Sequence, residues 1–176
     1  MKVTALMVAS VDGKITRGAE TDIYSWTSLE DQEHFFTTIR AARVICMGRK
    51  TWQAARDRIV LSPSTLRVVL TANPQVFMKD VVPGQLLFSA EQPVELVGRL
   101  AGEGYEELLL VGGSHTIGSF LLAGLVTDLK LTIEPWLFGS GTTLLPDLPI
   151  NQKLKLQSST QLNDQGTVLL HYSVTH

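Results

Sequence analysis

Short apolar segments that end in glycine and lead into a helix recur along this chain, and this order constrains its fold more than any other feature. Two such segments are residues 43–47, followed by Gly48, and residues 108–111, followed by a pair of glycines. Each has the length and composition of a buried strand, and a helix-forming segment follows each one. Strands and helices in alternation predict an α/β protein with a mostly parallel sheet.

The alternation extends over most of the chain and then stops. Further strands are expected at residues 3–8, 67–71 and 86–88, and helices at residues 28–42, 49–55, 93–102 and 116–123. After Gly124, apolar and polar residues alternate in residues 129–133, 154–158 and 167–174, with a turn at residues 163–166 and no helix between them. We therefore expect a three-layer α/β/α domain over residues 1–176, whose mixed sheet has antiparallel C-terminal strands.

Composition narrows the classes of function. The 176 residues are 44% hydrophobic and 18% charged, which suits one well-packed core. With 15 Lys and Arg against 17 Asp and Glu, the charge gives no reason to expect a nucleic-acid partner. Cys46 lies in an apolar run and is expected in the core of a cytoplasmic protein. We find no secretory signal, no membrane-spanning run and no metal-ligand spacing among His34, His115, His171 and His176.

The two strand–glycine–helix junctions contain the residues that a phosphate needs. Helix N-termini at the carboxyl ends of parallel strands collect in one crevice, with exposed N–H groups and close backbone approach at glycine. Hydroxyls are available from Thr51, Ser114 and Thr116, and Arg49 and Lys50 add positive charge. Two such sites with extra charge suit a dinucleotide with an additional 2′-phosphate, so NADPH is predicted rather than NADH. The alternative is that the glycines only end strands.

Other motif interpretations fit less well. Residues 48–51 do not form a Walker loop, and residues 112–114 do not form the six-residue Rossmann fingerprint. Ser114, Asp147 and His171 follow the chain order of an α/β-hydrolase triad. However, Thr116 replaces the final glycine of that motif, and His171 falls within a predicted strand.

Asp31 is the acidic residue with the clearest possible role in chemistry. It lies in the first turn of the helix that Ser28 is expected to cap, near Phe35 and Phe36. A carboxylate there could bind the N–H edge of a pyrimidine or pteridine ring, and burial would raise its affinity for protons. The other interpretation is that Asp31 is a helix cap, and the spacing alone favours the cap.

These residues resemble two related families. Residues 47–52 resemble the cofactor signature of dihydrofolate reductases, and residues 110–113 resemble their glycine-pair signature. Residues 10–15, Trp26–Ser28 and Glu30–Asp31 are more similar to the RibD C-terminal family, the reductase domain of riboflavin biosynthesis. Residues 137–146 match the glycine-rich segment of both families.

The resemblance implies a dihydrofolate reductase-like fold, NADPH across the strand ends, and hydride transfer to a small-molecule substrate, with Asp31 as the catalytic residue. The implied cofactor residues are Ala9, Ile15, Gly48, Arg49, Lys50, Thr51, Thr71, Gly112, Gly113, Ser114, His115 and Thr116. The implied substrate residues are Ser10, Lys14, Trp26, Ser28 and Phe35.

The chain departs from both families. Val111 stands where riboflavin reductases have glutamate, and those reductases lack the string formed here by residues 49–52. No proline lies between Asp12 and Asp31, unlike the loop of dihydrofolate reductases. The leading hypothesis is a reductase similar to 5-amino-6-(5-phosphoribosylamino)uracil reductase. The alternatives are a dihydrofolate reductase and a non-catalytic NADPH-binding module. A homodimer is also expected from the resemblance.

Overall fold

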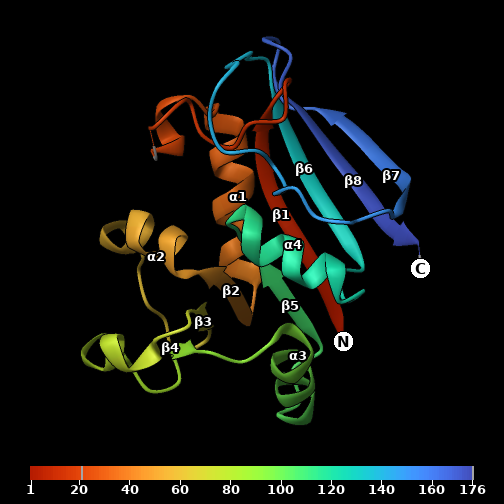
Figure 1. The fold of residues 1–176 in the computed structure, drawn as a ribbon. Coiled ribbons are helices and arrows are strands. Elements are labelled where there is room, and N and C mark those ends of the chain that lie inside the picture. The colour runs from red at the N-terminus through yellow and green to blue at the C-terminus, as the bar shows by residue number, and fades with distance from the viewer. Residues whose placement is uncertain (21, 176) are drawn as a thin grey trace.

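A computed structural model describes residues 1–20 and 22–175 and has eight strands in one sheet (Figure 1). The strands are β1 (Lys2–Ser10), β2 (Val44–Gly48), β3 (Leu66–Leu70), β4 (Leu86–Ser89), β5 (Glu107–Leu110), β6 (Asp128–Glu134), β7 (Lys153–Gln161) and β8 (Val168–Thr175). The α-helices are α1 (Leu29–Ala41), α2 (Arg49–Ala55), α3 (Pro93–Gly102) and α4 (Ser114–Leu122). Three 3-10 helices are η1 (Ile23–Ser25), η2 (Arg56–Arg58) and η3 (Pro74–Asp80).

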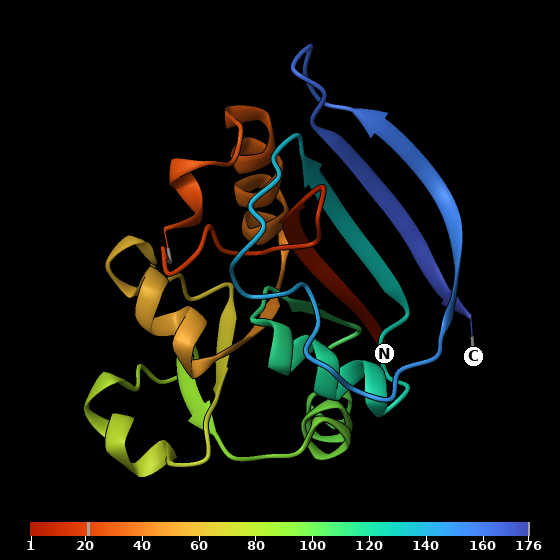
Figure 2. The same cartoon turned by 45° about the horizontal axis from the view of Figure 1, so that its top comes forward.

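The sheet has the order β4-β3-β2-β5-β1-β6-β8-β7. The first six strands in this order are parallel, β8 is antiparallel to β6, and β7 is antiparallel to β8. Figure 2 shows β7 and β8 curving away from the helix-covered part of the sheet. This arrangement confirms the predicted mixed sheet, with antiparallel strands where the alternation with helices stops.

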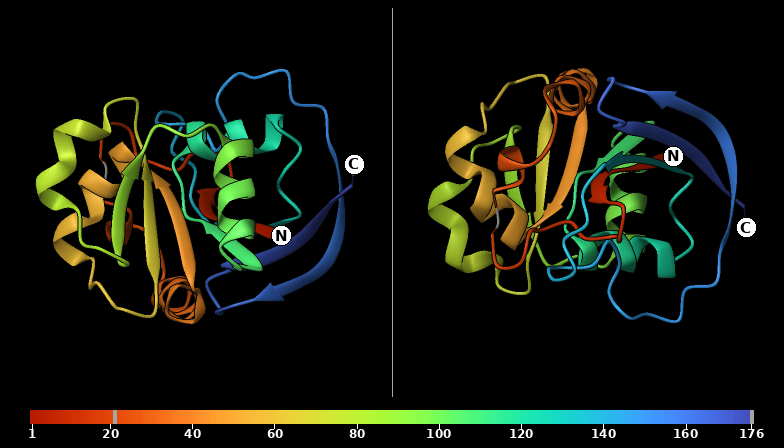
Figure 3. Two further views of the ribbon diagram at one scale, coloured as in Figure 1. Left: turned by 90° about the horizontal axis from the view of Figure 1, so that it is seen from below. Right: turned by 90° about the horizontal axis from the view of Figure 1, so that it is seen from above.

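Helices cover the two faces of the sheet. Leu96 and Leu100 of α3 and Phe120 of α4 pack in a core with alternate residues of β1, β2, β3 and β5. On the opposite face, Phe35 of α1 and Trp52 of α2 pack against the other residues of these strands. Figure 3 shows α1 on one side of the sheet and α3 and α4 on the other. The three layers agree with the prediction. The amino ends of α1, α2 and α4 follow the carboxyl ends of β1, β2 and β5.

The central strand β1 has an edge that no strand covers. Alternate residues of a parallel strand direct their backbone groups to opposite neighbours. The Lys2 amide bonds toward β5, and the Val3 carbonyl bonds toward β6. Pairing with β6 continues without a bulge to the end of β1, but pairing with β5 stops at Ala5. The backbone groups of Val8, which have the same direction as those of Lys2, therefore face the space beyond the end of β5.

Several elements differ from the prediction. Helix α4 begins at Ser114, and the 3-10 helix η3 was not predicted, because Pro74 suggested only a turn. Phe36 of α1, unlike the packed Phe35, is 36% exposed and stacks on Tyr24 with ring centroids 5.8 Å apart. Leu156 in the edge strand β7 is 51% exposed, since no helix covers that strand.

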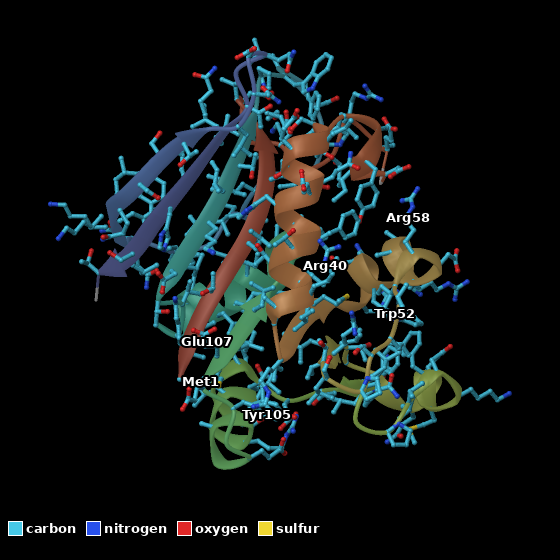
Figure 4. All side chains as sticks on the ribbon, turned by 180° about the vertical axis from the view of Figure 1, so that it is seen from behind. Met1, Arg40, Trp52, Arg58, Tyr105 and Glu107 are labelled. Atoms are coloured by element: carbon cyan, nitrogen blue, oxygen red, sulfur yellow. The ribbon has the colours of Figure 1, made fainter. Side chains whose placement is uncertain are left out.

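Some single residues are placed as expected. Cys46 is fully buried, and burial raises the pKa of its thiol. Figure 4 shows Trp52 on α2, and it shows Met1, Tyr105 and Glu107 at the amino-terminal end of the sheet. The longest helix, α1, has 13 residues, and no helix in the described part of the chain could cross a bilayer. The prediction for His176 lies outside the described residues.

Candidate active site

The two strand–glycine–helix junctions meet. The amide of Gly48 donates to the carbonyl of Gly112 at 3.0 Å, because β2 and β5 are neighbours in the sheet. A Cβ atom added at Gly48 would lie 2.6 Å from the hydroxyl oxygen of Thr116. A Cβ atom at Gly113 would lie 3.2 Å from the hydroxyl oxygen of Thr51. Each glycine therefore faces a threonine of the other junction, and no larger residue fits at Gly48 without a shift.

The residues at this meeting point suit phosphate groups. The amino ends of α2 and α4 present unpaired backbone N–H groups there. Neither the Thr51 hydroxyl nor the Thr116 hydroxyl donates a hydrogen bond to another described residue. Arg49 is only partly buried, and its guanidinium donates to Gln53 at 2.6 Å but pairs with no carboxylate among the described residues. We call the set Gly48, Thr51, Gly113 and Thr116 the glycine–threonine cradle.

Other predicted cofactor residues surround the cradle at different depths. Lys50 and His115 are exposed in the first turns of α2 and α4, whereas Ser114 is buried. Gly112 has a φ of +108°, a conformation that favours glycine. Thr71 lines a hollow of about 280 Å³ at the carboxyl ends of β3 and β4. Ile15 is partly buried and packs against the core that includes Phe120 of α4. These positions follow the strand ends across half of the sheet.

Ala9 is placed differently from the rest of the predicted set. Its side chain is fully buried in the core on the α3 and α4 face. Its backbone N–H and C=O groups point to the same side of β1 as those of Val3, and therefore toward β6. Val8, which the prediction passed over, directs its backbone groups to the open edge of β1. Ala9 and Val8 can be told apart once one hydrogen-bonded neighbour of β1 is known, because alternate residues direct their backbone groups to opposite sides.

Asp31 lies in the first turn of α1 and is 6% exposed. Burial raises the pKa of its carboxyl from 3.8 to about 6, and the charge of Glu134 adds to the rise. The Thr132 hydroxyl faces the carboxyl and opposes the rise, although the two groups do not form a hydrogen bond of standard geometry. Thr132 pairs with Val8 across β1 and β6. The carboxyl therefore lies over the strands that border the open edge.

Glu134 is a buried carboxylate that the prediction missed. It is the last residue of β6 and is 2% exposed. One of its oxygens accepts hydrogen bonds from the amide of Ser28 at 2.7 Å and from the hydroxyl of Ser28 at 2.8 Å. The other accepts the hydroxyl of Thr167 at 2.8 Å. The polar positions of β6, Lys130, Thr132 and Glu134, alternate with apolar ones, so they resembled a solvent-facing edge of the sheet.

The predicted substrate residues lie in and below the loop that joins β1 to α1. Ser10 is fully buried, and its hydroxyl bonds to Asp12 at 2.6 Å. Lys14 is partly buried, and its backbone pairs with that of Thr143 in an isolated antiparallel β-bridge. Trp26 is 4% exposed, and its buried indole N–H has no hydrogen-bond partner among the described residues. The structure therefore gives Ser10 a role within its loop and leaves the Trp26 N–H free.

Phe35 lies one turn after Asp31 on α1. Residues at this spacing share one face of a helix, and Phe35 packs against the core between α1 and the sheet. Ser28 is the N-cap of α1, and its hydroxyl accepts the Asp31 amide at 3.2 Å. Asp31 and Phe35 are thus brought together as predicted, while Ser28 is held by Glu134.

A second missed carboxylate joins two loops over the strand ends. Asp12 accepts the amides of Phe138 at 3.1 Å and Gly139 at 2.7 Å. The hydrogen bonds from Ser10 and these amides lower the pKa of Asp12 to about 2. Figures 1 and 2 show the loop after β1 beside the loop after β6. The predicted glycine-rich segment thus packs on the loop that carries Lys14.

The remaining alternatives do not assemble. His171 bonds to Asp128 at 2.7 Å at the beginning of β6, whereas Ser114 begins α4 at the opposite end of the sheet. The hydrolase triad is therefore not formed. The described residues contain no group of three or more potential metal ligands. A hollow of about 320 Å³ is lined by Trp52, Arg56 and Leu86, among others, and by no residue of the cradle.

The eight-stranded mixed sheet, the paired glycine junctions and the open edge of β1 define the dihydrofolate reductase-like class of α/β proteins. In agreement, a dihydrofolate reductase of Enterococcus faecalis complexed with NADP(H) superposes with a TM-score of 0.65. It is 18% identical, and the comparison covers 99% of this chain and 97% of that chain. Within this class, residues 1–168 match the RibD C-terminal domain, so the chain belongs to that family of reductase domains.

Relatives agree with this assignment. The uncharacterized protein YyaP of Bacillus subtilis is 25% identical over 175 residues, which are 94% of this chain and 91% of YyaP. A putative riboflavin biosynthesis protein of Shewanella has a TM-score of 0.81 at 21% identity, with both chains fully covered. A bifunctional deaminase and 5-amino-6-(5-phosphoribosylamino)uracil reductase of Thermotoga maritima has a TM-score of 0.76 at 16% identity. That comparison covers 99% of this chain and 56% of the bifunctional protein.

Proposed function

We propose that this protein is an NADPH-dependent reductase of a pyrimidine- or pterin-type substrate, closest in activity to 5-amino-6-(5-phosphoribosylamino)uracil reductase. The observation that carries the proposal is the order of three features along adjacent strands. The cradle lies at the ends of β2 and β5, the open edge belongs to β1, and the Asp31 carboxyl lies over β6. Adjacent strands are about 4.8 Å apart, so the β5 side of the cradle, the open edge and the carboxyl fall within about 10 Å. That span suits a dinucleotide's reactive ring and a second ring beside it.

The cofactor half of this site is assigned to NADPH. Thr51, Thr116 and the amino ends of α2 and α4 would hold the pyrophosphate, and Arg49 would hold the 2′-phosphate. The backbone groups of Val8, rather than Ala9, would bind the carboxamide of the nicotinamide at the open edge. When bound, NADPH supplies the hydride. The protein's part is to position the two rings and to exclude water.

Asp31 is assigned to the substrate. A carboxyl that is buried and has a pKa near 6 can hold a proton at the pH at which many enzymes work, and can bind a ring N–H. Trp26 offers a free indole N–H in the same part of the molecule. Asp31 would orient the substrate ring and supply the proton that accompanies hydride transfer. Phe35, one turn away, would form an apolar wall.

Two observations bear on the substrate. The family match supports the riboflavin-type substrate. The buried Asp31 beside Thr132, together with Val111 before the glycine pair, favours dihydrofolate as the second candidate. A non-catalytic NADPH-binding module is the alternative of another class, but a buried carboxyl over the substrate side has no evident role in it.

The test is turnover by the purified protein. We expect NADPH oxidation with the phosphoribosylamino-pyrimidine, and less or none with dihydrofolate. Calorimetric titration with NADPH and NADH should show tighter binding of NADPH. Binding of NADPH without turnover of either substrate would favour the non-catalytic module, and absence of nicotinamide binding would contradict the proposal. The predicted homodimer remains a prediction, which the mass measured by light scattering would check.

A further inference from the structure

Glu134 is the most deeply buried charged side chain among the described residues, and no cation pairs with it. A buried carboxylate is costly unless hydrogen bonds satisfy it. Glu134 receives three, two from Ser28 and one from Thr167. The contacts of such a group can fix the position of another residue. Here Glu134 contacts Ser28, and Ser28 in turn contacts Asp31.

The contact with Ser28 changes how α1 is capped. Ser28 is the N-cap, and Asp31 is the third residue of the helix. In a capping box, the side chain at this third position accepts the amide of the N-cap residue. Here the Ser28 amide instead donates to Glu134 at 2.7 Å. Glu134 therefore takes the bond that would otherwise hold the Asp31 carboxyl at the helix end.

The Ser28 hydroxyl completes the arrangement. It donates to Glu134 at 2.8 Å and accepts the Asp31 amide at 3.2 Å. The backbone of Asp31 is thus fixed through Ser28, while its side chain is free to turn toward Thr132. The sequence left open whether Asp31 is a cap or a substrate ligand, and this contact decides against the cap.

The far side of Glu134 is held by the turn between β7 and β8. Thr167, which donates to Glu134, also accepts Asn163 at 3.0 Å. The same Asn163 amide donates to Glu30 at 3.1 Å, so the turn contacts the first turn of α1 directly as well. The C-terminal hairpin, which lies outside the cofactor half, therefore supports the helix end that carries Asp31.

We propose that Glu134 is the positioning residue of this site: by accepting the Ser28 amide it releases the Asp31 carboxyl from capping α1 and leaves it free for the substrate. This inference rests on the proposed role of Asp31. Glu134 does not touch the substrate itself. The titratable groups around Asp31 are Glu134 and Lys130 from β6, Tyr24 from η1, and Glu30 and His34 from α1 itself.

Substitutions at Glu134 separate its two contributions. In Glu134→Gln, the side-chain carbonyl can still accept both Ser28 bonds, whereas the negative charge and the acceptor for the Thr167 hydroxyl are lost. In Glu134→Ala, the Ser28 amide loses its partner, and the Asp31 carboxyl is expected to turn and cap the helix. Glu30→Gln is the matched control, because it removes a first-turn charge that does not bond to Ser28.

The readout is the titration of the Asp31 carboxyl carbon by NMR, assigned with Asp31→Asn, together with steady-state kinetics. We expect the midpoint of Asp31 to fall in Glu134→Gln, because a neighbouring negative charge is lost. It should fall further in Glu134→Ala, because a hydrogen bond from the Ser28 amide would stabilise the ionised Asp31. Glu30→Gln should move the midpoint less. In Glu134→Ala, kcat should fall about tenfold or more while the affinity for NADPH is unchanged.

An Asp31 midpoint in Glu134→Ala that is no lower than the midpoint in Glu134→Gln would overturn the inference, because only the alanine variant frees the Ser28 amide. If Glu134→Ala does not fold, Glu134→Asp makes the comparison, because its shorter side chain keeps the negative charge but draws the carboxylate away from the Ser28 amide. If no substrate is turned over but the midpoint shifts as expected, the positioning role stands and the proposed reductase activity fails. If turnover is normal and the midpoint does not move, the reductase stands and the positioning role fails.

Discussion

The two halves of the candidate site are built in opposite ways. The cofactor half consists of backbone N–H groups, glycines and hydroxyls, with the cations Arg49 and Lys50 at its exposed rim. The substrate half is buried and carries two carboxylates, Asp31 and Glu134, within one hydrogen-bonded cluster. The first can receive a polyanion from solvent, and the second can hold a proton away from solvent. A mildly acidic chain therefore combines both properties by separating them across β1.

The largest effect is expected in the substrate half. Asp31→Asn keeps the size of the side chain but cannot ionise or supply a proton as a carboxyl does. Turnover should fall about 10²-fold or more, while the affinity for NADPH stays unchanged. Single-turnover kinetics and calorimetry would measure the two quantities. Loss of NADPH binding in this variant would mean that the halves are not separate.

Gly48→Ala tests the cradle. The added methyl would lie 2.6 Å from the Thr116 hydroxyl, so the hydroxyl must move. We expect the affinity for NADPH to fall about tenfold or more, since charge-assisted hydrogen bonds contribute about 1.5–3 kcal/mol each. Gly98→Ala in α3 is the control, because its methyl would meet open space. Unchanged NADPH affinity in Gly48→Ala would remove the cradle from the phosphate site.

Arg49→Ala tests the charge at the rim of the cofactor half. Loss of a guanidinium bond to the 2′-phosphate should weaken NADPH about tenfold and leave NADH nearly unchanged. The exposed Arg56, beyond the end of α2, serves as control for the loss of a positive charge. Calorimetric titration with both cofactors gives the comparison. Equal weakening of NADPH and NADH would show that Arg49 does not contact the 2′-phosphate.

The last effect is on stability rather than on binding or turnover, and it depends on pH. The pKa of Asp31 is raised from 3.8 to about 6, so its ionisation costs stability as the pH rises through this window. Asp31→Asn removes that cost. It should be more stable than wild type by about 1–3 kcal/mol at about pH 8 and equally stable at about pH 4. Urea unfolding at both pH values would test this, and an equal difference at both would contradict it.

Local motifs explain why the meeting of the two strand–glycine–helix junctions was predictable. Gly48 and Thr51 lie three residues apart, and the strand before them and the helix after them follow from the same short segment. The fold class, the sheet and the family were likewise predicted from alternation and motifs. Ala9 was chosen over Val8 because sequence alone does not say to which neighbour each residue of a strand directs its backbone.

The substrate half depends on contacts between distant residues. Ser28 and Glu134 are separated by 106 positions, and Thr167 lies further along the chain. The helix start at Ser28 was predicted, but no local signal shows that a strand end would cap it. A glutamate followed by Pro135 at the end of an alternating strand is the one signal that could have indicated a buried group. Ser10 differs, because its bonds to Asp12 and Lys14 are local ones within its own loop.

The most direct test of the two-part site is a thermal-shift experiment on wild type, Arg49→Ala and Asp31→Asn, each with NADPH and with the substrate, since ligand binding to the native state raises apparent stability. We predict that Arg49→Ala loses most of the protection by NADPH but keeps that by substrate. Asp31→Asn should keep protection by NADPH and lose protection by substrate. If both variants lose protection by the same ligand, or if NADPH does not protect the wild type, the division into a cofactor half and a substrate half is wrong.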